Sequence, residues 1–294
     1  MFPRQINDNL WILGNDYFHI YLISGSKYYA LVETGISAMA DILLEQLSSL
    51  GTKPDYLIVT HPHSDHITGL DYLKHSFPRA TVIAGDGAES FITHPKAAKT
   101  MIVEDLHMIK AMTSLGFCNY PAAIKNPPSL AGCRVVNEGE ELDMGDLTIS
   151  FLEARGHALG NIIVNMKDMN TTLVSDSLGN HYPERGFFPT FFTGFKDYIE
   201  TIDRLEKENP KYLGLAHNGF FSEREEIRNI FLKARKGAND VHNYIYDDKR
   251  SDAEIAKDLF DFYYTDELAI YSPQNILKCC RLLVLRVREL YKEN

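Results

Sequence analysis

The sequence predicts an α/β protein in which strands and helices are mixed over most of the chain, followed by a helical region. Two patterns support this prediction: short apolar runs bounded by turn residues, and apolar residues spaced at helical period between those runs. A third observation indicates a functional site. The apolar run 56–60 leads directly into the hexapeptide 61–66, HPHSDH, which holds four side chains able to bind a metal ion.

The first half of the chain reads as short strands followed by alternating helices and strands. Gly14 and Gly25 lie in turns between early apolar runs, and Gly51 ends a helix. The expected strands are residues 10–13, 20–23, 29–32, 56–60 and 80–84. The expected helices are residues 37–50, 70–77 and about 86–115. Residues 120–130 contain three prolines and read as an irregular loop.

The second half continues with strands and ends in helices. The expected strands are residues 133–136, 147–152, 161–164, 172–175 and 212–216, with a helix over 196–209. Two S-x-x-E patterns, beginning at Ser222 and Ser251, match the capping box that opens a helix. Ser272 followed by proline is typical of a third helix start. The chain therefore divides into a mixed domain, residues 1–221, and an α-helical region, residues 222–294.

Composition limits the partners and the location of the protein. The 294 residues include 30 basic and 40 acidic side chains, a net charge of −10, which argues against a nucleic-acid partner. No apolar stretch approaches the roughly 20 residues that cross a bilayer, and the first residues lack the features of a secretory signal. We therefore expect no membrane partner and a cytoplasmic location. Four cysteines form no C-x-x-C pair and are expected to be packing residues.

Three further candidate ligands follow predicted strands. His157 lies in a glycine-flanked turn, Asp176 directly follows one strand, and His217 follows the last strand. With the hexapeptide they form a set of five histidines and two aspartates at strand-to-loop junctions. Imidazole and carboxylate ligands without thiolate suit zinc, iron or manganese, and they leave a position open for water, as in catalytic sites.

The order of these motifs resembles the metallo-β-lactamase-fold hydrolase superfamily. The resemblance covers about residues 7–220 and depends on H-x-H-x-D-H, then G-H, S-D and H, together with the early turn Leu31-Val32-Glu33-Thr34-Gly35. It implies a four-layer αββα sandwich, two mixed sheets face to face with helices outside. It also implies a first metal held by His61, His63 and His157, a second held by Asp65, His66 and His217, and Asp176 bridging both.

The resemblance further implies a hydrolase with two divalent metal ions, zinc being the first choice and iron or manganese the alternatives. A hydroxide that bridges the ions would attack a carbonyl carbon, while Asp65 orients it and relays a proton. Glu33 stands where the superfamily more usually has aspartate. Glu33 and Thr60 are therefore expected to support the ligands from behind, with a geometry changed by one methylene.

The helical C-terminal region is similar to the branch of glyoxalase-II-like and aminobenzoylacetyl-CoA thioesterase-like enzymes. That similarity implies a small-molecule acyl substrate, a thioester or a related activated ester. A lactonase of the same fold is the nearest alternative. A metal-containing regulatory or binding protein and an iron-dependent, persulfide-oxidising enzyme are the others. The helices would cap the site or form a homodimer.

The segment 182–195 follows Asp176 and is rich in aromatic residues. Such side chains beside a metal centre can line an acyl pocket. The candidate substrate contacts are Tyr182, Phe188, Phe192 and Phe195. The alternative is that these rings only pack under the helical region or in a dimer contact.

Overall fold

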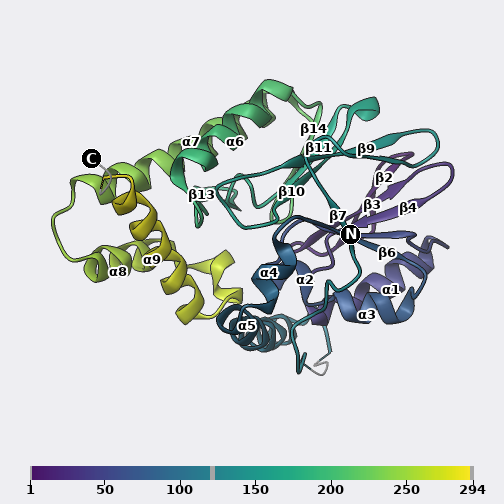
Figure 1. Ribbon diagram of the computed structural model, residues 1–294, viewed down its shortest axis with the longest axis horizontal. Coiled ribbons are helices and arrows are strands. Elements are labelled where there is room, and N and C mark those ends of the chain that lie inside the picture. The colour runs from purple at the N-terminus through teal and green to yellow at the C-terminus, as the bar shows by residue number, and fades with distance from the viewer. Residues whose placement is uncertain (1, 120–122, 292–294) are drawn as a thin grey trace.

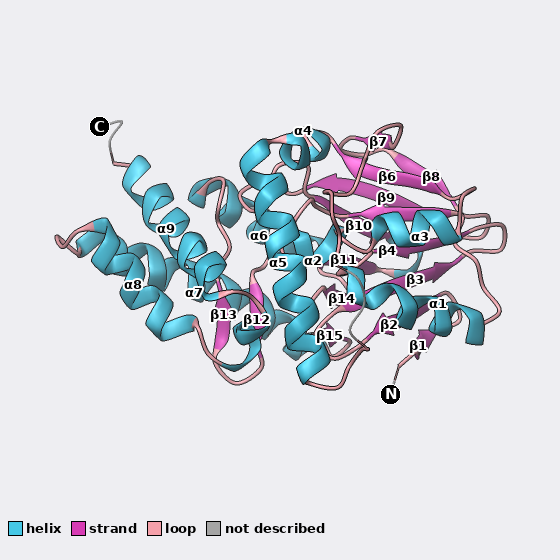
Figure 2. Cartoon of the chain, turned by 90° about the horizontal axis from the view of Figure 1, so that it is seen from below, coloured by secondary structure: helices cyan, strands magenta, loops and turns pink. Residues whose placement is uncertain are grey.

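The computed structural model describes residues 2–119 and 123–291, which form two mixed β-sheets packed face to face with helices outside them (Figure 1). This arrangement confirms the αββα fold. A helical C-terminal region extends from one end of the sandwich, and α5 runs between that region and the sheets (Figure 2). Within the described ranges, none of the helices combines the length and apolar character that spanning a bilayer requires.

The first sheet contains seven strands arranged in chain order. The first four strands pair in antiparallel fashion, and β4 to β7 run parallel, with helical crossovers between them. The strands are β1 (Arg4–Asn7), β2 (Leu10–Gly14), β3 (His19–Ser24), β4 (Tyr29–Val32), β5 (Tyr56–Val59), β6 (Thr81–Gly85) and β7 (Arg134–Val136).

The second sheet has the order β15-β14-β11-β10-β9-β8, and only the β11–β14 pair is parallel. A separate hairpin, β12–β13, occupies part of the aromatic segment. These strands are β8 (Glu141–Asp143), β9 (Thr148–Glu153), β10 (Ile162–Met166), β11 (Thr171–Ser175), β12 (Asn180–Tyr182), β13 (Gly186–Phe188), β14 (Tyr212–Leu215) and β15 (Phe220–Phe221). Strands β1, β8, β12, β13 and β15, each two to four residues long, are not among the predicted strands.

Strand alternation divides the core into two layers. In β3, Ile20 and Leu22 join the cluster under the helices, whereas Tyr21 and Ile23 join the cluster between the sheets. Successive side chains of a strand point to opposite faces, so one strand supplies both layers. Phe151 of the second sheet completes the inner layer and is fully buried.

Helices connect the strands and cover the outer faces (Figure 1). They are η1 (Ser37–Met39), α1 (Ala40–Ser49), α2 (Ser64–Ile67), α3 (Leu70–Ser76), α4 (Ala88–Thr93), α5 (Pro95–Ser114), η2 (Lys167–Met169) and α6 (Phe195–Glu208). The single helix expected over about 86–115 is divided in two. His94 is extended, with φ −67° and ψ 125°, because the residue before a proline avoids the helical conformation.

The C-terminal region consists of α7 (Arg224–Asp247), α8 (Asp252–Tyr263), η3 (Asp266–Ile270) and α9 (Pro273–Glu289). The capping box between Ser251 and Glu254 is confirmed, and Ser272 caps α9 as expected. The box expected at Ser222 is wrong, because no side chain caps α7. The chain is still paired as a strand through Phe221, so the helix begins later than the pattern indicates.

Contacts with α5 anchor the C-terminal region beside the ligand loops. The buried Glu104 carboxylate accepts hydrogen bonds from the backbone N–H of Ser272 (3.1 Å) and from its hydroxyl (2.5 Å). Leu283 of α9 and Met108 of α5 belong to one hydrophobic cluster. The four cysteines are free, and Cys280 is buried in that cluster.

Candidate metal centre

The seven candidate ligands come from loops that follow four strands in two sheets. The hexapeptide follows β5 and continues into α2, whose first turn carries Asp65 and His66. His157 follows β9, Asp176 follows β11, and His217 follows β14. Because β11 and β14 are parallel neighbours, Asp176 and His217 reach the same edge of the sheet.

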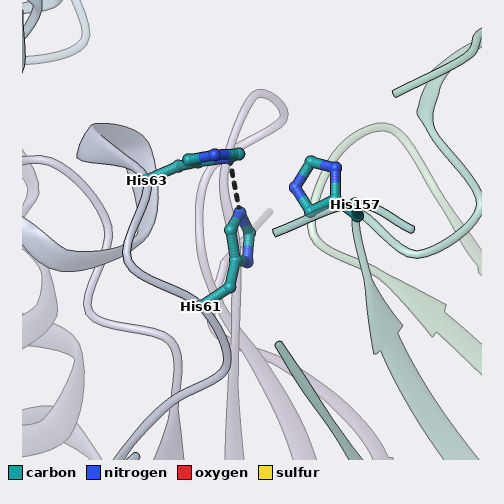
Figure 3. Close-up of side chains that lie close together, drawn as sticks. All are labelled: His61, His63 and His157. Carbon is teal, nitrogen blue, oxygen red and sulfur yellow. Dashed lines mark hydrogen bonds between the residues drawn. The ribbon is translucent and has the colours of Figure 1, made fainter. Parts of the chain in front are cut away.

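The first ligand group is His61, His63 and His157, whose ligand atoms all lie within 4.8 Å of one another. Figure 3 shows the three rings directed toward one another, with His61 Nε2 3.1 Å from His63 Nδ1. The ring centroid of His157 lies 4.7 Å from each of the other two. Three imidazoles from two sheets therefore converge on one point.

The second group is Asp65, His66, Asp176 and His217, which meet the same 4.8 Å limit. Asp65 Oδ2 lies 3.3 Å from Nε2 of both His66 and His217. Asp176 borders both groups, because its Oδ2 lies 3.4 Å from His66 Nε2 and 3.9 Å from His157 Nε2. Its other oxygen, Oδ1, lies 3.5 Å from His217 Nε2.

Backbone carbonyls orient two of the imidazoles. His157 Nδ1 lies 3.0 Å from the carbonyl oxygen of Thr190, and His217 Nδ1 lies 2.7 Å from that of Tyr17. A carbonyl can only accept a hydrogen bond, so in each neutral ring Nδ1 carries the proton and Nε2 carries the lone pair. Both lone pairs are therefore free to bind a cation, an arrangement common behind metal-bound histidines.

Glu33 connects the first sheet to the ligands from behind. Its Oε1 accepts hydrogen bonds from the hydroxyls of Thr60 (2.6 Å) and Ser175 (2.7 Å), and its Oε2 lies 3.1 Å from His66 Nδ1. Ser175 has φ +49°, a conformation that glycine adopts at lower cost. The hydrogen bond from the Ser175 hydroxyl to Glu33 compensates for this cost.

The pKa values of His61, His63 and Asp176 favour the protonation states that bind a cation. Burial, and then the neighbouring imidazoles, lower the pKa of His61 well below its usual value and that of His63 to about 3, so both rings are neutral. Burial acts to raise the pKa of Asp176, but the facing His66 and His217 outweigh it and hold this pKa at about 2. Neutral imidazoles and an ionised carboxylate are the forms that bind metal ions.

Unpartnered buried atoms test whether a cation fits. Four ligand atoms have no hydrogen-bond partner among the described residues: His66 Nε2, His157 Nε2, His217 Nε2 and Asp176 Oδ1. Each buried polar atom left in this state costs about 1–3 kcal/mol. Cations bound by the two groups would satisfy all four atoms, and the nitrogen and oxygen donors suit zinc, iron or manganese.

Tyr271, from the C-terminal region, also reaches the ligands, and sequence patterns do not reveal it. Its hydroxyl donates a 2.8 Å hydrogen bond to Asp65 Oδ2, across 206 residues of chain. Burial, followed by the nearby Asp65 and Asp176 carboxylates, raises its pKa well above the usual value, so the hydroxyl keeps its proton. The only local signal was the neighbouring N-cap, Ser272, which indicates a helix and not a site.

A cavity of about 720 Å³ opens on the ligands and is lined by part of the aromatic segment. Phe188 and Phe192, two of the four candidate substrate contacts, line it. Tyr182 and Phe195 lie outside its lining: the Tyr182 hydroxyl donates to the carbonyl of Tyr263, and Phe195 stacks on an imidazole of α7. The segment that holds these rings folds into β12, β13 and the start of α6.

Comparisons with known proteins agree with this architecture. The family model of the metallo-beta-lactamase superfamily matches residues 15–217. The metallo-beta-lactamase fold-containing protein ST1585 of Sulfurisphaera tokodaii is 25% identical over 212 residues, 69% of this chain and 73% of that protein. The acyl-coenzyme A thioesterase MBLAC2 of Gallus gallus is 22% identical over 205 residues, 64% of this chain and 66% of that protein.

Among solved structures, the metallo-beta-lactamase family protein TTHA1429 from Thermus thermophilus has a TM-score of 0.67 at 18% identity, with 97% of this chain and 95% of that chain covered. A structural similarity at this low sequence identity shows that the two proteins share a fold. The family match covers all residues of both ligand groups and ends at His217. The chain belongs to the metallo-beta-lactamase superfamily.

Proposed function

We propose that this protein is a binuclear metal-dependent hydrolase that cleaves a thioester or a related activated ester. The observation that carries the proposal is the position of Asp176 between the two ligand groups. Its Oδ2 lies 4.0 Å from His61 Nε2 in the first group and 3.4 Å from His66 Nε2 in the second. One carboxylate can therefore serve two cations, as in two-metal hydrolases.

Metal ions held by the two ligand groups would supply a water molecule of lowered pKa and a Lewis acid for the carbonyl oxygen. A side chain of the protein, Asp65, transfers the proton. Asp65 lines the cavity, and Tyr271 fixes its Oδ2 through a hydrogen bond. As the water oxygen attacks the carbonyl carbon, Asp65 accepts the proton. Asp65 then returns the proton to the departing sulfur as the C–S bond breaks, which leaves a carboxylic acid and a thiol.

Two observations favour a thioester. The cavity beside the ligands has an apolar wall that suits an acyl group, including Phe188, Phe192 and Leu282. A relative that is 22% identical carries the name acyl-coenzyme A thioesterase. A thiolate is also a good leaving group, so its departure needs no strongly acidic side chain.

The test begins with metal analysis of protein purified without added ions. We expect two metal ions per chain, zinc before iron or manganese. Octanoyl-coenzyme A and N-octanoyl homoserine lactone, assayed side by side, should show the larger kcat/KM for the thioester. Preference for the lactone, or no turnover of either compound by the metal-loaded protein, would contradict the proposal.

Replacing the shared ligand tests the metal centre directly. Asp176→Ala removes the carboxylate that borders both groups, so the variant should lose at least one metal ion and nearly all turnover. Mass spectrometry of the native protein measures the metal content, and a thiol-detecting assay measures turnover. The matched control is Asp71→Ala, an exposed aspartate on α3, which should retain both. Full activity in Asp176→Ala would mean that this carboxylate is not a ligand.

A further inference from the structure

The cavity that opens on the metal centre extends well beyond the ligands. Its volume of about 720 Å³ lies within the range of sites that enclose whole small molecules, roughly 300–1,000 Å³. Its lining includes His63, Asp65, His157 and Asp176 of the two ligand groups. The walls come from α5 and α9, which contribute Met101, Ile276, Leu282 and Leu285. A ligand as small as the reacting group alone would leave most of this space empty.

The cavity is also lined by cations, although the chain carries a net charge of −10. Lys96 on α5 and Lys278 and Arg281 on α9 line it and are exposed, which places them at its solvent side. No carboxylate among the described residues lies within ion-pair distance of these three side chains. Within the described ranges, the only carboxylates that line the cavity are the two ligands Asp65 and Asp176.

Arg286 lines the same cavity but has a different role. Its Nε donates a 2.7 Å hydrogen bond to the carbonyl oxygen of Phe192, and its Nη1 pairs with Glu289. These contacts fix the aromatic wall to α9. The cations left for a ligand are therefore Lys96, Lys278 and Arg281 (the cationic rim).

We propose that the cavity binds an amphiphilic acyl thioester: an apolar acyl chain of medium length joined to a carrier that bears phosphate groups. This inference rests on the proposed function, because the thioester carbon must reach the metal centre. The acyl chain packs on the apolar walls, and the phosphate groups of the carrier bind the cationic rim. Basic side chains without ion-pair partners, placed around an apolar cavity, favour a ligand that has both an apolar part and a negatively charged part over a small neutral ester.

Binding is measured without turnover by using thioether analogues, in which a methylene group between the carbonyl and the sulfur prevents hydrolysis. Calorimetry on the metal-loaded protein compares the octanoyl analogue of coenzyme A with the octanoyl analogue of pantetheine, which lacks phosphate groups. We expect the phosphorylated analogue to bind at least about tenfold more tightly at low salt, with the difference shrinking as salt screens the charges. Equal affinities would overturn the assignment of the cationic rim.

The double variant Lys278→Gln/Arg281→Gln removes two rim charges. It should weaken binding of the phosphorylated analogue about tenfold and leave the pantetheine analogue unchanged. The matched control, Lys99→Gln/Lys110→Gln, removes two exposed charges of α5 outside the cavity and should change neither affinity. Equal losses in both double variants would indicate a general charge effect and would overturn the proposal.

Acyl length tests the apolar wall. Each methylene that enters the cavity should increase affinity by up to about fourfold, so butanoyl, hexanoyl and octanoyl analogues should bind in rising order. A flat series would remove the acyl half of the proposal.

These outcomes separate the inference from the proposed function. If the analogues bind as expected but no thioester is hydrolysed, the proposed function fails and the binding site remains. If thioesters are hydrolysed but neither phosphate nor rim charge matters, the function remains and this inference fails.

Discussion

Glu33 is the residue through which one sheet controls the orientation of a ligand. It holds Thr60 and Ser175 with one oxygen and faces His66 Nδ1 with the other, at 3.1 Å. The longer side chain makes both contacts from a residue with φ +74°. Glutamate in place of the usual aspartate therefore still provides a carboxylate behind the imidazole of His66.

Glu33→Gln tests this role with little change of shape. The amide cannot present a charged oxygen to His66 Nδ1, so metal affinity should fall about 10- to 100-fold. Competition with a chelator of known affinity measures the change. Glu33→Asp keeps the charge and should lose less affinity than Glu33→Gln. The reverse order would show that side-chain length matters more than charge.

Tyr271→Phe tests the contact between the C-terminal region and Asp65. The variant keeps the ring and removes the hydrogen bond of 2.8 Å to Oδ2. A hydrogen bond to a charged group is worth about 1.5–3 kcal/mol, so kcat should fall by about tenfold or more. The metal content should stay at the wild-type value, because no ligand is lost. An unchanged kcat would limit Tyr271 to a packing role.

At the scale of elements, the residues at the start of α9 both cap this helix and contact α5. Ser272 caps the helix by accepting from the N–H of Asn275 (3.1 Å), and it donates to the buried Glu104 of α5. Tyr271 is therefore held in place by Ser272, which follows it. A hydrogen bond of 3.0 Å from the Tyr264 hydroxyl to the carbonyl oxygen of Tyr271 also holds it. Two adjacent residues, Tyr271 and Ser272, therefore provide the cap of α9, the contact with α5 and the hydrogen bond to Asp65.

Ser272→Ala should remove both the cap and one hydrogen bond to Glu104. Loss of an N-cap costs about 0.5–2 kcal/mol, and an unpartnered buried oxygen adds about 1–3 kcal/mol. The free energy of unfolding, measured by chemical denaturation, should fall together with kcat. Ser251→Ala is the control, because it removes the capping box of α8 and should reduce stability without changing kcat. Equal effects of both variants on kcat would contradict the link between α9 and Asp65.

At the scale of the whole molecule, a metal centre would join three parts of the fold. His61 and His63 follow a strand of the first sheet, His157 and Asp176 follow strands of the second, and Tyr271 brings in the C-terminal helices. Dimerisation through those helices stays a prediction, supported by exposed apolar side chains such as Phe262 of α8, which is 62% exposed.

Metal removal should therefore destabilise the entire protein. Metal ions at 100 times their Kd add about 2.7 kcal/mol of stability, so chelation should lower Tm by several degrees. The effect depends on pH. Burial lowers the pKa of His66 and His217, but the facing Asp65 and Asp176 carboxylates outweigh burial and raise both values in the cation-free protein.

Bound metal requires both imidazoles to be neutral, so metal affinity is full above the raised pKa values and falls as pH falls through them. Scanning calorimetry with and without zinc, from pH 8 down to pH 5, measures this trend. A zinc-linked increase in Tm that grows toward acid pH would contradict the sign. The cation-free protein serves as the control at each pH.

Much of the fold and of the metal centre follows from local patterns. The apolar run of β3, the glycine stops and the caps at Ser251 and Ser272 each act within a few residues, so they can be recognised in the sequence. Ligand identity is equally local, because His61, Asp176 and their partners follow apolar strands directly. The pattern failed at Ser222, where pairing of β15 competes with the capping box.

By itself, the sequence determined which residues can hold metal ions and the order of most of the strands and helices. Only the tertiary structure decided that Tyr271 meets Asp65, that Ser272 meets Glu104, and that α5 and α9 enclose a cavity with a cationic rim. The physical reason is distance along the chain. Spacing and capping record neighbours within a few residues, whereas these contacts join segments 168 to 206 residues apart and depend on how packed layers meet.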